Sequence, residues 1–274
     1  MGVSSLVVSC EHGGHAVPAA LRHCFVGARA VLASHRGWDP GALPLAAQMA
    51  QAFAAPLFAA TTTRLVIDLN RSLGHRQLFS EFTRGLPRAE REAIVAAHYR
   101  PHRDRVEGDI ARRIGAGEAV THIASHSFTP VLSGTVRQAD VAWLYDPRRE
   151  REAALALRWM ACFALHAPRT LHAPHAPQLR LRRNYPYQGR GDGLASLLRK
   201  RFGGAAYRGI ELEVNQRFVI AGGAPWAALR GALVASLAQA LDGTLDGTLA
   251  EPLAEPLIDP IGKPPGQPTH HRRP

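Results

Sequence analysis

Two histidines and one aspartate carry the clearest chemical signal in this sequence. His12 and His126 each lie at the end of a short apolar run, and Asp39 precedes a proline that can begin a helix. Two neutral imidazoles and one carboxylate make a three-ligand zinc site that leaves a fourth position for water. Zinc in such a site lowers the pKa of that water and polarises a carbonyl oxygen. These residue types therefore favour metal-assisted hydrolysis.

The spacing of these residues leaves other roles open. Asp39 would serve equally well as a helix cap, and His12 as a loop histidine bonded to the backbone. His15 is a rival ligand because it stands at His-x-x-His spacing from His12. The two glycines between them exclude the shared helical face on which zinc motifs of that spacing depend.

Two acidic residues alternate on one expected strand, 207–215. Glu211 and Glu213 therefore lie on the same face of that strand. Carboxylates inside a core strand are costly to bury unless they are paired or lie near a metal. One of them is a candidate general base for a metal-bound water. The alternative is that they form ion pairs with Arg208 or Arg217.

Asn70 and Arg71 follow a further apolar run, 65–69. A guanidinium group offers a planar fork of donors that matches a carboxylate. An amino-acid substrate would present such a carboxylate. The alternative is a structural salt bridge at the strand end, where Asp68 would orient Arg71 or pair with another arginine.

Strands and helices alternate along the chain. The expected strands are 6–10, 57–60, 65–69, 120–126, 141–145 and 207–215, and the expected helices are 39–54, 88–114 with a kink or break at Pro101, 149–164 and 225–241. This order predicts an α/β fold with helices on both faces of a sheet. Sites in such sheets form beyond the carboxyl ends of the strands. Polar residues stand at four of these strand ends, and this convergence is the main argument for an enzyme.

Length and composition indicate one domain. The 274 residues are 46% hydrophobic, which suits a single α/β domain over 1–241. The stretch 166–193 is rich in His, Pro and Arg and is expected to be a long loop over one end of the sheet. Direct repeats and prolines in 242–274 predict a disordered tail.

The charge and the cysteines limit the possible partners and location. The net charge is +11, but the arginines are scattered, which argues against nucleic-acid binding and suits a small anionic substrate. Three irregularly spaced cysteines give no disulfide framework. With no signal-like first segment and no apolar run of 18 residues, we expect a cytoplasmic protein without a membrane span.

Several short motifs occur along the chain, at 9–18, 37–42, 64–72, 98–102, 125–130, 184–187 and 209–216. In sequence and in order they resemble those of the N-formylglutamate amidohydrolase family. Leu-Asn-Arg-Ser and His-Ser-Phe-Thr-Pro are the most specific of them. The family is similar in turn to zinc carboxypeptidases and zinc muramoyl-alanine amidases, which implies a three-layer α/β/α sandwich around a mixed, mostly parallel sheet.

The resemblance also implies a set of site residues. By analogy with the amidases, His12, Asp39 and His126 hold one zinc ion, with Asp39 standing where those relatives have glutamate. Glu213 is then the catalytic base, and Glu211 is the reserve candidate.

The expected reaction is hydrolysis of N-formyl-L-glutamate to formate and L-glutamate, as in histidine breakdown. Asn70 and Arg71, with Arg137 or Asn184, are expected to hold the substrate carboxylates. His102 is expected to stabilise the oxyanion, since the tetrahedral intermediate needs a donor there.

Two alternatives belong to other classes. A zinc amidase or peptidase of the same fold would act on another N-acyl amino acid or a small peptide. A non-catalytic binding protein would use the scattered arginines. The oligomeric state does not follow from the sequence.

Overall fold

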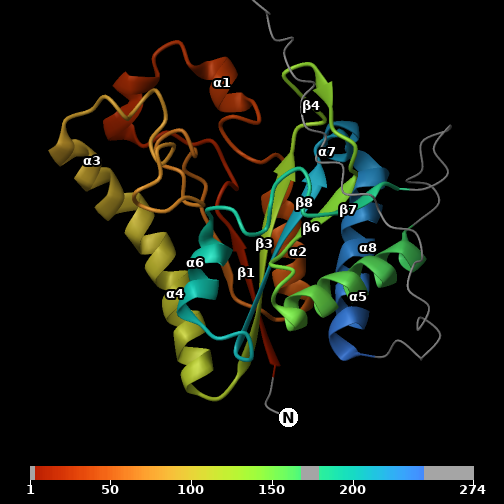
Figure 1. The fold of residues 1–274 in the computed structure, drawn as a ribbon. Helices are drawn as coiled ribbons and strands as arrows, with labels where there is room; N and C mark the ends of the chain where they lie inside the picture. The colour runs from red at the N-terminus through yellow and green to blue at the C-terminus, as the bar shows by residue number, and fades with distance from the viewer. Residues whose placement is uncertain (1–3, 168–178, 244–274) are drawn as a thin grey trace, which may run out of the picture.

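Six strands form one mixed sheet in the computed structural model, which describes residues 4–167 and 179–243 (Figure 1). The strands, in sheet order, are β2 (Leu57–Ala59), β1 (Ser4–Cys10), β3 (Ala119–Phe128), β8 (Tyr207–Asn215), β6 (Val141–Leu144) and β7 (Leu181–Arg183). Strand β6 runs antiparallel to β8, and all other neighbouring pairs are parallel. This confirms the predicted mixed, mostly parallel sheet.

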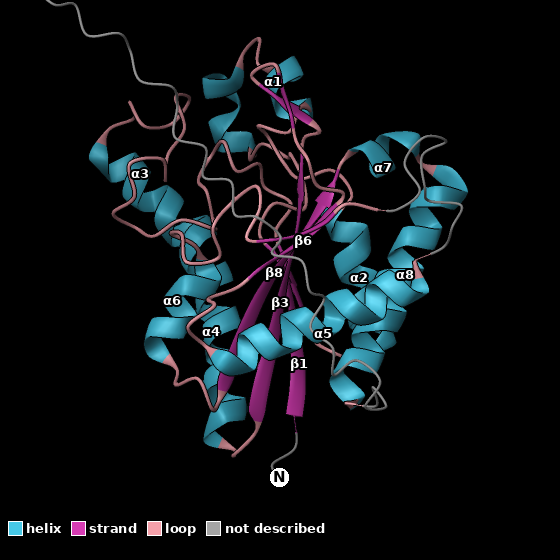
Figure 2. Ribbon diagram, turned by 45° about the vertical axis from the view of Figure 1, so that its right-hand side comes forward, coloured by secondary structure: helices cyan, strands magenta, loops and turns pink. Residues whose placement is uncertain are grey.

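Helices cover both faces of the sheet (Figures 1 and 2). One face carries α4 (Arg100–Gly115) and α6 (Leu194–Arg201), and the other carries α2 (Ala42–Ala52), α5 (Glu150–His166) and α8 (Gly223–Asp242). The smaller elements are η1 (Ala19–Phe25), α1 (Arg29–Ala33), α3 (Arg88–Ile94), the π-helical turn η2 (Val95–Tyr99), α7 (Arg217–Ala221) and a hairpin of β4 (Val131–Leu132) and β5 (Thr135–Val136). The three-layer prediction is confirmed.

The central strands are apolar on both faces because both faces are covered. On β1, Val8 packs into the larger core beneath α2, α5 and α8, where Trp143 meets Trp159 edge to face at 5.8 Å. Its neighbour Val7 points to the opposite layer and contacts Val106 of α4 in a smaller core. Most polar side chains on these strands lie near the carboxyl ends, and this places the site.

The predicted strand at 65–69 is wrong. Its apolar side chains are buried, but they belong to a separate cluster with Phe25 and Leu78. The backbone makes local bonds instead of a sheet ladder, since the Val66 N–H donates to Thr63 O at 3.0 Å and the Asp68 N–H donates to Leu78 O at 2.8 Å. A short apolar run signals burial and does not fix the backbone conformation.

The predicted helix at 88–114 forms from three consecutive helical segments, α3, η2 and α4. Pro101 lies in the first turn of α4 and lacks the N–H that the preceding turn would accept. The helix widens just before it, and the Arg100 N–H bonds to Val95 O, five residues back. The irregularity predicted at Pro101 is therefore a π turn.

Two other predictions are only partly tested by the described residues. The predicted loop at 166–193 is interrupted by strand β7, and 168–178 lie outside the described part of the chain. The last helix ends at Asp242, and residues 244–274 of the predicted tail 242–274 also lie outside the described part of the chain. Among the described helices, none is long and apolar enough to cross a membrane.

Candidate metal centre and its cavity

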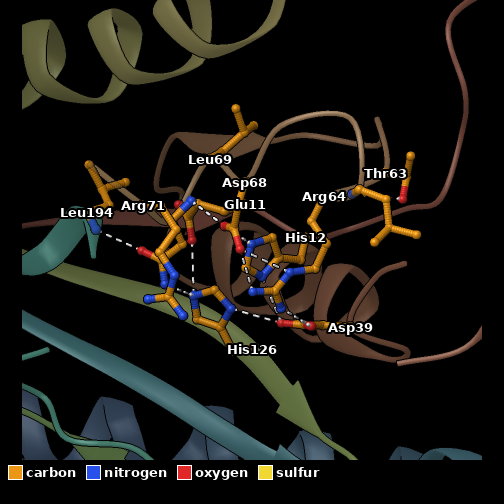
Figure 3. A network of polar contacts seen from close by, with 12 residues as sticks. Glu11, His12, Asp39, Thr63, Arg64, Asp68, Leu69, Arg71, His126 and Leu194 are labelled. Atoms are coloured by element: carbon orange, nitrogen blue, oxygen red, sulfur yellow. Dashed lines mark hydrogen bonds and ion pairs between the residues drawn. The ribbon is translucent and has the colours of Figure 1, made fainter. Parts of the chain in front are cut away.

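His12, Asp39 and His126 come together at the carboxyl end of the sheet (Figure 3). One ligand atom from each lies within 4.8 Å of the others, and all three residues are buried. The Nδ1 atoms of His12 and His126 face the same oxygen, Asp39 Oδ2, at 3.2 and 2.9 Å. The structure thus brings together the three residues that the sequence proposed as ligands.

Neighbouring strands and one loop position this His-Asp-His cluster. His12 follows β1, and His126 lies near the end of its parallel neighbour β3. The backbone N–H of Asp39 donates to His12 O at 2.9 Å, which ties the loop before α2 to the end of β1. The hydroxyls of Ser125 and Ser127 hold backbone carbonyls at the start of α2 at 3.0 and 2.7 Å. Asp39 is therefore fixed beside both imidazoles.

Asp39 does not cap the helix that follows it. Helix α2 begins after Gly41, which adopts the left-handed conformation at φ 85°, and no side chain caps its first turn. The carboxylate of Asp39 is directed to the two imidazoles instead. Of the two readings left open by the sequence, the structure favours the ligand.

Each imidazole in the cluster also meets a second carboxylate through its other nitrogen. His12 Nε2 lies 2.8 Å from Asp68 Oδ1, and His126 Nε2 lies 3.1 Å from Glu11 Oε2. The first contact is an aligned hydrogen bond, whereas the second is close but less well aligned. Because an ionised carboxylate only accepts, each Nε2 favours the protonated state and leaves Nδ1 as the coordinating nitrogen.

The carboxyl groups around the cluster are held in the ionised form. Burial raises the pKa of Asp39 and of Asp68, but His12 and the Arg64 guanidinium outweigh it and hold both pKa values well below the ordinary range. Arg64 lies 2.6 Å from Asp68 and 3.5 Å from Asp39. Burial also raises the pKa of Glu11, and its contacts with imidazoles hold that pKa well below the ordinary range.

This donor set fits a divalent cation. Three buried carboxylates converge on two imidazoles, and one guanidinium compensates them only in part. Burial lowers the pKa of His126, but Asp39 and Glu11 outweigh it and raise that pKa well above its ordinary value. The arrangement therefore favours positive charge at the position between His126 and Asp39, where an ion with nitrogen and oxygen ligands would lie.

Glu213 lies directly beside the cluster. It is the Cα partner of His126 in the β3–β8 register, so both side chains emerge from the same face of the sheet. Burial, opposed by His126 and reinforced by Asp39 and Glu211, raises the pKa of Glu213 to about 8. Its Oε2 is buried with no hydrogen-bond partner among the described residues. A carboxyl group of this kind can take up and release a proton near neutral pH.

Glu211 lies two residues earlier on the same face of β8. Asn70 Nδ2 is 3.4 Å from Glu211 Oε2, and Asn70 Oδ1 accepts the backbone N–H of Leu194 at 2.7 Å. The Asn70 amide is thus engaged at both ends by protein groups. It links the segment after 65–69 to the acidic face of β8.

A cavity of about 300 Å³ opens over the cluster, and both Glu211 and Glu213 line it. Arg71, Arg137 and Tyr187 line it as well. Arg71 donates to Asp192 O at 2.7 Å, and Arg137 donates to the Tyr187 hydroxyl at 3.2 Å. The guanidinium groups of Arg71 and Arg137 suit the carboxylate of a bound ligand.

Three residues considered as site candidates lie elsewhere. Asn184 Oδ1 accepts the backbone N–H groups of Tyr145 and Gly189 at 3.0 and 3.1 Å, outside the cavity lining. His102 does not line the cavity either, and its Nε2 lies 3.4 Å from Glu11 Oε1. The rival ligand His15 is exposed and outside the cluster.

Other site residues were not assigned by the sequence analysis. No role was predicted for Glu11, which belongs to one of the polar strand ends, and Asp68 was considered only as an arginine partner. His35 and Tyr187, which line the cavity, were not singled out. The sequence signal for Glu11 is its position next to His12. A carboxylate buried beside a proposed ligand needs a partner of its own, so it is a candidate for the same site.

Fold and site together define an α/β protein with a candidate metal centre at the carboxyl edge of its sheet, an arrangement suited to hydrolytic chemistry. The chain matches the N-formylglutamate amidohydrolase family over residues 4–220 and belongs to that family. The predicted resemblance is confirmed.

Two crystal structures are similar to the chain. That of the gene product Atu2144 from Agrobacterium tumefaciens is 30% identical, with a TM-score of 0.72 over 88% of this chain and 91% of that chain. That of N-formylglutamate amidohydrolase from Ralstonia eutropha JMP134 is 17% identical, with a TM-score of 0.57 over 88% of this chain and 94% of that chain. The second likeness supports the fold alone. A comparison with curated proteins found no match.

Proposed function

We propose that this protein is a zinc-dependent amidohydrolase that hydrolyses N-formyl-L-glutamate to formate and L-glutamate. The observation that carries the proposal is the convergence of His12, Asp39 and His126 within 4.8 Å, beside the buried Glu213. Membership of the N-formylglutamate amidohydrolase family supports the substrate.

The metal would be held by Nδ1 of His12, Nδ1 of His126 and the Asp39 carboxylate. Zinc, or a similar divalent ion, supplies Lewis acidity toward the formyl oxygen and lowers the pKa of a coordinated water. Asp68 and Glu11 hold the far sides of the two imidazoles, which fixes the orientation of their coordinating nitrogens.

Glu213 is the residue we assign as general base. It takes a proton from the attacking water as the oxygen adds to the formyl carbon. When the carbon–nitrogen bond breaks, the same carboxyl group passes that proton to the leaving amine, so that formate and the amino acid are released. Glu211 is the reserve candidate on the same face of β8.

Arg71 and Arg137, which line the cavity, would bind the substrate carboxylates, because a guanidinium group offers a planar fork of donors that matches a carboxylate. Asn70 lines the same cavity and orients Glu211. We assign the oxyanion role predicted for His102 to a donor that lines the cavity instead, such as His35.

We further assign the reaction to histidine breakdown in the cytoplasm. The three cysteines Cys10, Cys24 and Cys162 are free, which suits a reducing compartment. A zinc amidase or peptidase acting on another N-acyl amino acid and a non-catalytic binding protein are the alternatives that the following experiment separates.

The test measures formate or amine release from a panel of N-acyl amino acids with zinc-loaded protein. We expect turnover to be fastest with N-formyl-L-glutamate. Glu213→Gln should lower kcat by about 10²- to 10⁴-fold while it keeps about one zinc per chain. Glu211→Gln is the matched control and should lower kcat less.

Each alternative gives a different result. Faster turnover of an N-acetyl or peptide substrate would replace the proposed substrate with a related one. A protein that binds zinc but turns over none of the panel would refute the hydrolase. A greater loss in Glu211→Gln than in Glu213→Gln would exchange the roles of the two glutamates.

A further inference from the structure

A line of polar contacts leads from the proposed metal ligand His126 away from the substrate cavity. His126 Nε2 lies 3.1 Å from Glu11 Oε2, and Glu11 Oε1 lies 3.4 Å from His102 Nε2. Glu11 is 0% exposed and His102 is 8% exposed. Because a carboxylate has acceptors only, an imidazole N–H is the group that suits each of these oxygens.

We propose that Glu11 and His102 form an outer layer that positions His126 for the metal, so that His102 is a positioning residue and not an oxyanion donor. His102 fixes one oxygen of Glu11, and the other oxygen faces His126 Nε2. This arrangement directs His126 Nδ1 toward Asp39. The inference rests on the metal site of the proposed function.

The two proposed imidazole ligands are supported unequally, which explains why His102 matters. Asp68, behind His12, is held by Arg64 at 2.6 Å and by the backbone N–H of Asn70 at 2.9 Å. Glu11, behind His126, has His102 as the partner of its Oε1. Loss of His102 would leave a fully buried carboxylate with His126 as its one ion-pair partner among the described residues, and its orientation would no longer be fixed.

The start of α4 holds His102 in a defined place. The Tyr99 hydroxyl donates to Arg71 O at 2.7 Å, and Arg103 donates to Leu69 O at 2.8 Å. These bonds flank His102 and tie the first turn of α4 to the segment that lines the substrate cavity. The π turn η2 ends directly before this turn. His102 is therefore a buried, anchored residue and not a histidine on the helix surface.

His102 also borders a second cavity, of about 160 Å³, on the side away from the substrate. His98 lines this second cavity as well. His102 contacts the metal cluster through Glu11. This separation allows a positioning role to be distinguished from direct contact with substrate.

The test titrates metal-free protein with Co²⁺ alone, follows its visible absorption band, and measures the Kd by competition with a chelator. Glu11→Gln should weaken Co²⁺ binding by about 10- to 100-fold. His102→Ala should weaken it by about 10-fold and alter the band. His102→Gln should bind nearly as well as the natural protein, because its amide nitrogen can take the place of Nε2. His98→Gln is the matched control and should change neither quantity.

Three results would overturn the proposal. An unchanged Co²⁺ Kd and band in His102→Ala, with a lowered kcat, would return His102 to the oxyanion role. Equal weakening in His102→Gln, His102→Ala and His98→Gln would indicate a general effect on the fold. A natural protein that binds no Co²⁺ would remove the site itself, whereas a protein that binds Co²⁺ as expected but fails to hydrolyse N-formyl-L-glutamate would refute only the proposed reaction.

Discussion

Two buried histidines on one strand have opposite surroundings. His126 and His122 lie four residues apart on β3, and even spacing places them on the same face. His126 lies between the carboxylates of Asp39 and Glu11, at 2.9 and 3.1 Å. His122 lies between two hydroxyls, Ser9 Oγ and Tyr207 Oη, each at 2.8 Å.

The groups that contact a buried histidine, rather than its burial, distinguish a metal-ligand candidate from a core histidine. Burial lowers the pKa of His122 to about 4, and the charge of Glu11, which acts in the opposite direction, does not outweigh it. Hydroxyls donate as well as accept, so Ser9 and Tyr207 satisfy a neutral imidazole on both nitrogens. The pKa of His126 is raised well above its ordinary value because its carboxylate contacts outweigh burial. Only the second environment favours a cation.

The strongest test of this comparison exchanges the same side chain at both positions. His126→Gln should reduce bound zinc from about one per chain to almost none and lower turnover of N-formyl-L-glutamate by at least about 10³-fold, because the site loses a ligand. His122→Gln should retain its zinc. Metal analysis after dialysis, with an activity assay on the same samples, measures both. Zinc retained in His126→Gln would break the comparison.

The sequence predicted the parts of this site that depend on strand ends. His126 lies near the end of β3 and Glu213 near the end of β8, so period and position were enough to place them at strand ends, and the motif resemblance selected Glu213 over Glu211 as the base. The motif resemblance added Asp39, whose spacing alone also suited a helix cap.

The sequence could not predict partners that come from distant parts of the chain. Glu11 and His102 are 91 residues apart, and Ser9 and His122 are 113 residues apart, so no local pattern links either pair. For the same reason His122 and His126 look alike in sequence. The segment 65–69 was given the wrong conformation because its burial comes from a separate cluster and not from the sheet.

The contrast between satisfied and available groups extends to the arginines of the cavity. Arg64 is engaged by two carboxylates, whereas Arg137 donates to the Tyr187 hydroxyl and pairs with no carboxylate among the residues described. Arg137→Gln should therefore raise the KM for N-formyl-L-glutamate by about 10- to 100-fold and affect kcat less. Arg88→Gln removes a guanidinium whose side chain is 86% exposed and should leave KM unchanged. Steady-state kinetics would contradict the assignment if KM did not respond to Arg137.

The smallest expected effect concerns the pH dependence of stability at His122. Its pKa is about 4 in the fold against an ordinary value of 6.5, so the unfolded chain binds a proton at a pH where the folded protein does not. The folded state therefore loses stability as the pH falls from above 6.5 toward 4. This one group should remove about 2 kcal/mol from the free energy of unfolding between pH 7 and pH 5.

His122→Gln should make that pH dependence shallower by about the same 2 kcal/mol, even if the variant is less stable at pH 7. Urea unfolding at pH 5, 6 and 7 measures the difference from the natural protein. Protons that bind at groups other than residue 122 affect both proteins and cancel in the comparison to first order. The exposed His15→Gln should leave the slope unchanged. Equal slopes for His122→Gln and the natural protein would mean that His122 can take up a proton in the fold, and the contrast between the two histidines of β3 would disappear.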